Sequence, residues 1–199
     1  MNKISILGGA FNPIHNGHLF IAKESIRTFG LEKVIFVPTG NPAFQKEDLL
    51  DKFDRAKLVE IAVNGEQSFE ISLFEVEREV TSYYIDTLNY FLKKYSEVYT
   101  IMGEDSFLEF HRWKDYKEIV NKTQFIIAER FGDGFKRTSK YIEVHFRDYS
   151  GKFFFLPHPL FRISSTFIRE RIKENKPISY LVPEGVEKEI VQKNYYKKP

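Results

Sequence analysis

The sequence of 199 residues contains no cysteine. Disulfide scaffolds, zinc–thiolate sites and cysteine nucleophiles are therefore excluded. The sequence also lacks a strong charge of either sign, because 30 Lys and Arg residues stand against 28 Asp and Glu residues, for a net charge of +2. Proteins that coat nucleic acid usually carry a large basic excess, so this balance argues against such a role.

Long apolar runs are missing as well. Runs such as 153–157 are far too short to cross a bilayer, and the N-terminal region has neither the apolar stretch nor the cleavage site of a signal peptide. We therefore expect a cytoplasmic protein without a membrane or nucleic-acid partner; an oligomer is possible, but no pattern reports it. The length suits a single domain, 1–199, that buries a sizeable core without stabilising cross-links such as disulfides or metal sites.

Short apolar runs alternate with segments of helical periodicity along most of the chain. The alternation predicts an α/β fold with a doubly wound, largely parallel sheet, helices on both faces and a small helical part from about residue 164. We expect strands at 4–7, 34–37, 69–73, 98–102, 125–128, 141–146 and 153–156, and a loop at 131–140. We expect helices at 16–29, 51–63, 84–95, 104–120, 164–175 and 184–194.

The first candidate site follows the first predicted strand, where residues 8–18 read Gly-Gly-Ala-Phe-Asn-Pro-Ile-His-Asn-Gly-His. Two glycines let the backbone approach a bulky anion, and the start of the next helix favours negative charge. His15 and His18 are three residues apart at that helix start, so both rings should lie on about the same side. Two surface histidines or a metal pair are the alternatives, but a metal needs further ligands, and none lies nearby in the sequence.

The second candidate site is the start of the helix predicted from residue 164. Ile163 precedes three residues that are good helix caps: Ser164, Ser165 and Thr166. Arg169 follows one turn later. A cap alone explains one hydroxyl and contributes about 1 kcal/mol. Three hydroxyls, the helix amides and a guanidinium together fit a polyphosphate.

A third group of residues follows the strand at 98–102. Gly103 and Asp105 come directly after that strand, and Trp113 is flanked by His111, Arg112 and other polar residues. A lone tryptophan is more commonly a core or interface residue. Its polar neighbours favour a partly open site here, in which the indole can stack on a ligand.

Together these motifs resemble those of the nucleotidylyltransferase superfamily with a His-x-Gly-His-type motif, and within it the bacterial nicotinate-nucleotide adenylyltransferases, from Ile4 to about Ile190. The resemblance implies a Rossmann-like fold and transfer of AMP from ATP to nicotinate mononucleotide, which gives deamido-NAD and pyrophosphate in NAD biosynthesis. Mg²⁺ would accompany ATP, with no metal ligands from the protein. The alternatives are another acceptor, nicotinamide mononucleotide or pantetheine phosphate, and a non-catalytic nucleotide sensor of the same fold.

The resemblance also implies a role for each matching residue. The expected catalytic residues are His15, His18 and Arg169. The expected ATP-binding residues are Gly8, Gly9, Ala10, Phe11, His15, His18, Gly103, Asp105, Ile163, Ser164, Ser165, Thr166 and Arg169. The expected acceptor-binding residues are Lys46, Tyr83, Tyr84, Trp113 and Lys114.

The sequence departs from the family pattern at three places. Ala10 stands where the family usually has Thr or Ser, so one hydroxyl near the phosphates is missing. Tyr84 stands where the family usually has Thr. The loop 41–46 lacks the family's Pro-Pro-His-Lys and keeps at most Lys46.

Overall fold

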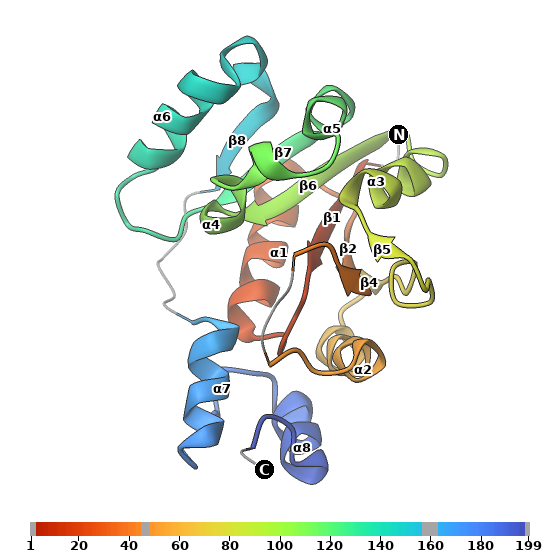
Figure 1. Ribbon diagram of the computed structural model, residues 1–199, viewed down its shortest axis with the longest axis vertical. Coiled ribbons are helices and arrows are strands. Elements are labelled where there is room, and N and C mark those ends of the chain that lie inside the picture. The colour runs from red at the N-terminus through yellow and green to blue at the C-terminus, as the bar shows by residue number, and fades with distance from the viewer. Residues whose placement is uncertain (1–2, 45–47, 157–162, 198–199) are drawn as a thin grey trace. The chain divides into compact units, whose positions relative to one another are not determined.

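A six-stranded parallel sheet organises the fold, with the spatial strand order β4–β2–β1–β6–β7–β8 (Figure 1). The computed structural model describes residues 3–44, 48–156 and 163–197. The strands of the sheet are β1 (Lys3–Gly9), β2 (Lys33–Pro38), β4 (Phe69–Ile71), β6 (Glu97–Gly103), β7 (Gln124–Ala128) and β8 (Phe153–Leu156). A second sheet pairs two short strands, β3 (Asn41–Pro42) and β5 (Thr81–Ser82), which the sequence did not predict.

The strand order confirms the predicted α/β fold with a doubly wound, Rossmann-like sheet. The chain begins in the middle of the sheet with β1, moves outward through β2 and β4, and returns to the other side of β1 with β6, β7 and β8. Right-handed crossovers place the helices of these two directions on opposite faces of the sheet. Ligands bind such sheets at the carboxyl ends of the strands where the direction reverses, which here are the ends of β1 and β6.

Continuous apolar runs form the buried strands. The side chains of 4–7 in β1, 34–37 in β2 and 125–128 in β7 are buried without a break. Uninterrupted burial is typical of parallel strands that are covered on both faces. Pairing of β1 with β6 is in register from Lys3 opposite Glu97 to Leu7 opposite Ile101.

Eight α-helices and two 3₁₀ helices are described in these ranges. The α-helices are α1 (Asn16–Phe29), α2 (Lys52–Val63), α3 (Tyr84–Leu92), α4 (Glu104–Phe107), α5 (Tyr116–Lys122), α6 (Lys136–His145), α7 (Ser165–Lys173) and α8 (Glu184–Lys193). The 3₁₀ helices are η1 (Phe110–Arg112) and η2 (Arg147–Lys152). None of the described helices is long and apolar enough to span a membrane.

The single helix predicted at 104–120 is wrong. The structure divides this segment into α4, η1 and α5. Trp113 adopts an extended backbone with ψ of 144°, and Asp115 lies in the left-handed region with φ of 54°. Both conformations end a helix, so Trp113 lies in a bend between two short helices and not in the middle of a long one.

The strand predicted at 141–146 is also wrong, and so is the second half of the loop predicted at 131–140, because α6 runs through Lys136–His145. Thr138, Ile142 and Phe146 are buried and lie four residues apart, which is the spacing of one helix face. Apolar and polar residues alternate locally at 141–146, and this alternation led to the prediction of a strand. The polar residues that precede it form the exposed first turns of the helix.

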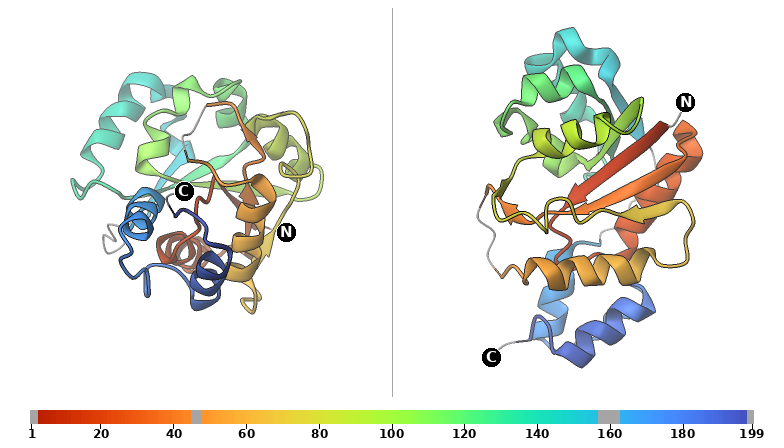
Figure 2. Two further views of the ribbon diagram at one scale, coloured as in Figure 1. Left: turned by 60° about the horizontal axis from the view of Figure 1, so that its bottom comes forward. Right: turned by 90° about the vertical axis from the view of Figure 1, so that its right-hand side faces the viewer.

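The chain divides into two compact units. Unit 1 comprises Met1–Gly8, Ile21–Ile35 and Tyr83–Phe161, and unit 2 comprises Gly9–Phe20, Phe36–Ser82 and Arg162–Pro199. The helical part expected from about residue 164 corresponds to α7 and α8 in unit 2, where α8 lies along α2 (Figure 2). A single domain over 1–199 stays a prediction.

Candidate active site

The turn after β1 is held in shape by a buried arginine of unit 2. Arg55 on α2 is 1% exposed. Its guanidinium donates hydrogen bonds to the carbonyl oxygens of Ala10 at 2.7 Å, Thr39 at 2.7 Å and Leu50 at 2.9 Å. Burial lowers the pKa of Arg55, but an arginine stays charged at any ordinary pH. One charged group thus fixes three backbone segments around the predicted phosphate site.

Asn12 provides a second support for the same turn. Its side-chain amide donates to the carbonyl oxygen of Asp48 at 2.8 Å and accepts from the backbone N–H of Leu50 at 3.1 Å. The sequence interpretation missed both Asn12 and Arg55 as positioning residues. An arginine on the face of α2 that also carries the buried residues Ala56 and Val59 was the available signal.

The two histidines of the motif lie against each other, as their spacing predicted. The rings of His15 and His18 stack with centroids 3.6 Å apart and an interplanar angle of 24°. The backbone N–H of His15 donates to Nδ1 of His18 at 3.2 Å. Because Nδ1 accepts this bond, the geometry assigns the ring proton of neutral His18 to Nε2. His18 therefore presents Nε2 as a hydrogen-bond donor.

Neighbouring residues limit how far these rings can turn. Phe11 is 3% exposed, and its ring meets His18 edge-on with centroids 5.1 Å apart. A Cβ at Gly17 would lie 3.1 Å from Nδ1 of His15. The small residue at position 17 therefore lets the His15 ring lie against the start of α1.

The start of α7 is tied to the turn of Asn12 and Pro13. Ser165 Oγ donates to the carbonyl oxygen of Pro13 at 2.8 Å, and Arg169 Nη1 donates to that of Asn12 at 2.9 Å. Arg169 Nε is buried and has no hydrogen-bond partner among the residues that the structure describes. Unit 2 thus brings the first two predicted motifs together, although about 150 residues separate them in the sequence.

The three hydroxyls at the start of α7 have different environments. Ser164 is the N-cap, and its side chain accepts from the N–H of Phe167 at 3.1 Å. The hydroxyl of Ser165 is bound to Pro13, as described above. Thr166 is exposed. Since α7 is nine residues long, its first turn also presents N–H groups at the positive end of the helix dipole.

In unit 1, the predicted residues Gly103 and Asp105 lie at the end of β6. A Cβ at Gly103 would lie 2.5 Å from Oδ1 of Asp105, so a larger residue would displace that carboxylate. Asp105 is exposed, and Nε of Arg130 lies 3.8 Å from its Oδ1.

Glu104 between them was missed in the sequence. It is fully buried and accepts hydrogen bonds from the N–H of Arg130 at 2.9 Å and the hydroxyl of Thr138 at 2.5 Å.

Four residues predicted to bind the acceptor also lie together in unit 1. The rings of Tyr84 and Trp113 meet edge to face with centroids 5.5 Å apart, and Nζ of Lys114 lies 4.3 Å from the ring centre of Tyr83. The Tyr84 hydroxyl is hydrogen-bonded to Thr100 at 2.6 Å, so this side chain is anchored in the sheet. Trp113 is half-buried. Lys46, the fifth predicted residue, lies outside the described residues.

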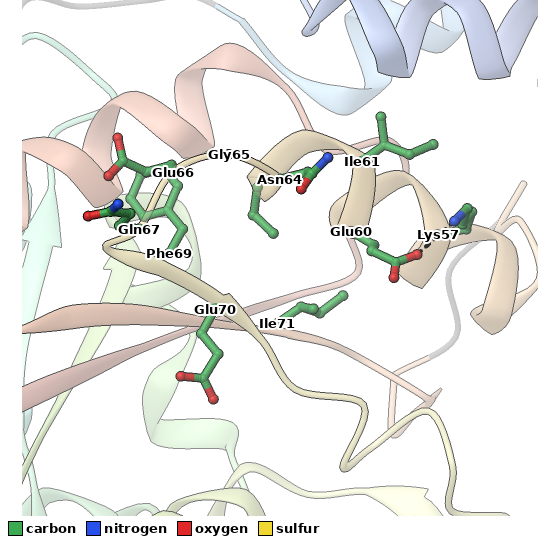
Figure 3. Close-up of a pocket in the computed structure, with 11 residues that line it drawn as sticks. Lys57, Glu60, Ile61, Asn64, Gly65, Glu66, Gln67, Phe69, Glu70 and Ile71 are labelled. Atoms are coloured by element: carbon green, nitrogen blue, oxygen red, sulfur yellow. Dashed lines mark hydrogen bonds and ion pairs between the residues drawn. The ribbon is translucent and has the colours of Figure 1, made fainter.

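A cavity of about 700 Å³ lies elsewhere in unit 2, between the end of α2 and β4 (Figure 3). It contains none of the predicted site residues. Its charged lining consists of Lys57, Glu60, Glu66 and Glu70. Three carboxylates against one ammonium group make this cavity a poor site for a nucleotide phosphate.

Within the described ranges, no group of three or more His, Cys, Asp or Glu side chains could hold a metal ion. The phosphate-binding candidates are instead N–H donors and cations. This donor set suits a polyanion better than a metal ion.

A Rossmann-like sheet whose first strand leads into a glycine-containing turn, two stacked histidines and a helix start suits the binding of a nucleotide phosphate. The family described as "Cytidylyltransferase-like" matches residues 6–171. The chain therefore belongs to the cytidylyltransferase-like family.

Bacterial relatives resemble the chain over nearly its whole length. A protein of Clostridium kluyveri is 39% identical, covering 99% of this chain and 100% of the relative, and one of Desulfitobacterium hafniense is 40% identical, covering 98% and 96%. Both are named "Probable nicotinate-nucleotide adenylyltransferase".

Solved structures support the same fold. The nicotinic acid mononucleotide adenylyltransferase of Plasmodium falciparum complexed with NaAD superimposes with a TM-score of 0.79 at 20% identity, covering 98% of each chain. Its complex with APC gives a TM-score of 0.75 at 19% identity, with the same coverage. At this identity the likeness concerns the fold alone.

Proposed function

We propose that the chain is a nicotinate-nucleotide adenylyltransferase of NAD biosynthesis. It transfers AMP from ATP to nicotinate mononucleotide and forms deamido-NAD and pyrophosphate. The observation that carries the proposal is the stacked His15–His18 pair, which follows the turn at Asn12 that Arg169 binds, in a chain that matches bacterial relatives of that name over nearly its full length.

The residues proposed to bind the triphosphate of ATP are donors. His18 offers Nε2–H, because its Nδ1 already accepts the backbone N–H of His15. Arg169 offers Nε–H, while its Nη1 is held by the carbonyl oxygen of Asn12. The first turns of α1 and α7 add backbone N–H groups. Gly8, Gly9 and Ala10 are proposed to let the chain pass close to the nucleotide, and a contact of Gly103 and Asp105 with the nucleotide stays a prediction.

The reaction requires that the two anionic substrates are aligned and that the charge on the leaving pyrophosphate is neutralised. An oxygen of the acceptor's 5′-phosphate attacks the α-phosphorus of ATP. The bond from that phosphorus to the bridging oxygen breaks, and its electron pair leaves with pyrophosphate. The attacking phosphate is already an anion at neutral pH, so no general base is needed. Donors fixed before the reaction stabilise the charge that moves onto the leaving group.

Mg²⁺ is proposed to arrive as part of the substrate, Mg-ATP. Mg²⁺ binds phosphate oxygens and keeps several waters. The described residues offer no cluster of carboxylates and histidines for it, which fits an ion held by the triphosphate. The chain's own donors then act on the oxygens that the ion leaves uncovered.

The acceptor is assigned to the aromatic group of unit 1. Trp113 is half-buried and packed on Tyr84, so one face of the indole can stack on a pyridine ring. Lys114 and the backbone N–H groups near Tyr84 suit the carboxylate of nicotinate. The role of Lys46 and a cytoplasmic location stay predictions.

Pyrophosphate release tests the proposal. The protein is mixed with Mg-ATP and, in separate reactions, nicotinate mononucleotide, nicotinamide mononucleotide or pantetheine phosphate. We expect the fastest release with nicotinate mononucleotide. Faster release with another acceptor would reassign the substrate, and no release with any of them would leave a nucleotide-binding protein without this activity.

A further inference from the structure

Tyr141 on α6 makes contacts that the proposed reaction does not use. Its hydroxyl oxygen accepts the backbone N–H of His111 at 2.9 Å and lies 2.7 Å from Nδ1 of the same residue. The hydroxyl donates this second bond when Nδ1 is unprotonated and accepts it when Nδ1 carries the ring proton. In either tautomer, both hydrogen bonds of the hydroxyl go to one residue of η1.

The N–H that Tyr141 binds is one that a short helix cannot satisfy alone. The first N–H groups of a helix have no partner within it. Glu109, the N-cap of η1, makes no side-chain cap hydrogen bond. A helix of three residues has little stability of its own. Tyr141 takes the place of the missing cap and fixes where η1 begins.

Trp113 is the next residue after η1 and depends on its geometry. The N–H of Trp113 donates to the carbonyl oxygen of Phe110 at 3.0 Å, and the indole meets the Phe110 ring edge to face with centroids 5.5 Å apart. Phe110 is fully buried. The direction of the indole is therefore set by η1, and the start of η1 is set by Tyr141.

The packing of Tyr141 does not require its hydroxyl. Its ring lies edge-on to Phe107 at 5.3 Å and against Phe146 at 5.6 Å, and both contacts would persist with phenylalanine at this position. The hydroxyl adds only the connection to His111. Replacing Tyr141 by phenylalanine therefore tests the hydroxyl group while keeping the packing of the ring.

We propose that Tyr141 is a positioning residue for acceptor binding: its hydroxyl fixes η1 and, through it, the orientation of the Trp113 ring. The proposal rests on the proposed function, because Trp113 is there assigned to the pyridine ring. Tyr141 itself touches neither substrate. Its loss should therefore affect the acceptor and leave ATP binding and the reaction step unchanged.

The test compares Tyr141→Phe with a matched control, Tyr116→Phe. Tyr116 belongs to the same aromatic cluster, with ring contacts to Phe110 and Phe146, and its hydroxyl makes no hydrogen bond among the described residues. Tyr141→Phe loses both hydrogen bonds to His111, and losing one such bond corresponds to about threefold to tenfold, so we expect the KM for nicotinate mononucleotide to rise about threefold or more. The KM for ATP and kcat should stay within about twofold, and Tyr116→Phe should match wild type.

A second readout needs no substrate. Trp113 is the sole tryptophan of the sequence, so intrinsic fluorescence reports on it alone. We expect acrylamide to quench Tyr141→Phe more strongly than wild type or Tyr116→Phe. His111→Ala keeps the backbone bond to Tyr141, so its KM for the acceptor should rise less than that of Tyr141→Phe.

Three results would overturn the positioning role: equal behaviour of Tyr141→Phe and Tyr116→Phe, a loss of kcat or ATP affinity as large as that of acceptor affinity, or an equal rise in KM in His111→Ala. A wild-type protein without pyrophosphate release would instead reject the proposed function. In that event, unchanged quenching in Tyr141→Phe would also reject the link from Tyr141 to Trp113, and increased quenching would support it.

Discussion

At the scale of single residues, His18 is the one for which we propose the most specific chemical role. The bond from the His15 N–H to Nδ1 and the edge contact with Phe11 fix its ring, so Nε2–H is presented in one direction. Removing a donor aimed at developing charge typically costs about 2.7–4 kcal/mol of barrier. We expect His18→Ala to lower kcat about a hundredfold to a thousandfold, as measured by pyrophosphate release.

A conservative variant separates the lost donor from a damaged fold. His18→Gln keeps an N–H donor of similar reach, and it should retain more activity than His18→Ala. Circular dichroism of both variants should match wild type. A folded His18→Ala protein with near-normal kcat would remove His18 from the reaction.

Residues that act at a distance along the sequence could not be predicted in the same way. The histidine motif could be recognised in the sequence because its glycines, helix start and i, i+3 spacing are local features. Arg55 acts on the carbonyl groups of Ala10 and Thr39, which only the folded chain brings within 2.7 Å of its guanidinium. Tyr141 was hidden for the same reason, and also because its helix was interpreted as a strand.

At the scale of elements, α7 connects the second motif to the first. Arg169 is anchored on Asn12, with its Nε buried and unbonded among the described residues. We expect Arg169→Ala to weaken ATP binding more than nicotinate mononucleotide binding, because the guanidinium is proposed to meet the triphosphate. A charged hydrogen bond contributes about 1.5–3 kcal/mol, so the loss of ATP affinity should be roughly tenfold or more.

Arg171 on the same helix is the matched control. Its guanidinium donates to the carbonyl oxygen of Pro177 at 2.8 Å and lies over the Phe167 ring at 5.6 Å, so it faces other partners than Arg169 does. Calorimetric titration of Arg171→Ala should show a smaller loss of ATP affinity than Arg169→Ala. Equal losses in both variants would point to net charge, and a loss confined to the acceptor would place Arg169 elsewhere.

Strand prediction was correct where burial is continuous, and it was wrong at 141–146, where burial is one-sided and helical. The strands at 4–7, 34–37 and 125–128 were correct because each is a short buried run that is apolar apart from Ser5. The segment at 141–146 alternates locally, and its helical face becomes visible only when Thr138 is added. The predicted helix at 104–120 breaks near Trp113 because Asp115 adopts a left-handed conformation, and no local sequence pattern indicates that conformation.

At the scale of the whole molecule, three tyrosines connect stability to alkaline pH. Burial raises the pKa of Tyr141 to about 12 and that of Tyr195 to about 12, and it also raises the pKa of Tyr196. An unfolded tyrosine titrates near pH 10. Between these values the unfolded chain has released protons that the folded chain still holds. The stabilising contribution is thus complete below about pH 10 and is lost as pH rises towards about 12.

Tyr196→Phe provides the test of this pH dependence. The Tyr196 hydroxyl is buried without a hydrogen-bond partner among the described residues, so its removal should not destabilise the protein at pH 8. We expect urea midpoints to fall between about pH 10 and 12, and to fall less in Tyr196→Phe than in wild type. The same decline in both proteins would show that Tyr196 does not contribute.

Acceptor choice decides which activity the molecule as a whole has. Nicotinate and nicotinamide mononucleotides differ only in carboxylate against carboxamide, and a carboxylate accepts hydrogen bonds whereas an amide also donates them. Backbone N–H groups near Tyr84 and the ammonium of Lys114 are donors, so the carboxamide NH₂ would face donors. Each opposed polar group costs about 1–3 kcal/mol. We expect kcat/KM to favour nicotinate mononucleotide by at least about tenfold.

Trp113 should contribute equally to both acceptors, since stacking on the ring does not distinguish its substituents. An aromatic pair contributes about 0.5–1.5 kcal/mol, so Trp113→Ala should lower kcat/KM about twofold to tenfold for each acceptor and leave their ratio unchanged. Trp113→Phe keeps a ring and should lose less. Measuring kcat/KM for both acceptors in wild type and both variants tests the two contributions separately.

Equal use of the two acceptors by wild type would reject the donor-lined carboxylate site. A changed ratio of the two kcat/KM values in Trp113→Ala would show that the indole itself contributes to specificity. Unchanged kcat/KM values for both acceptors would show that Trp113 does not bind the acceptor and is a packing residue of unit 1.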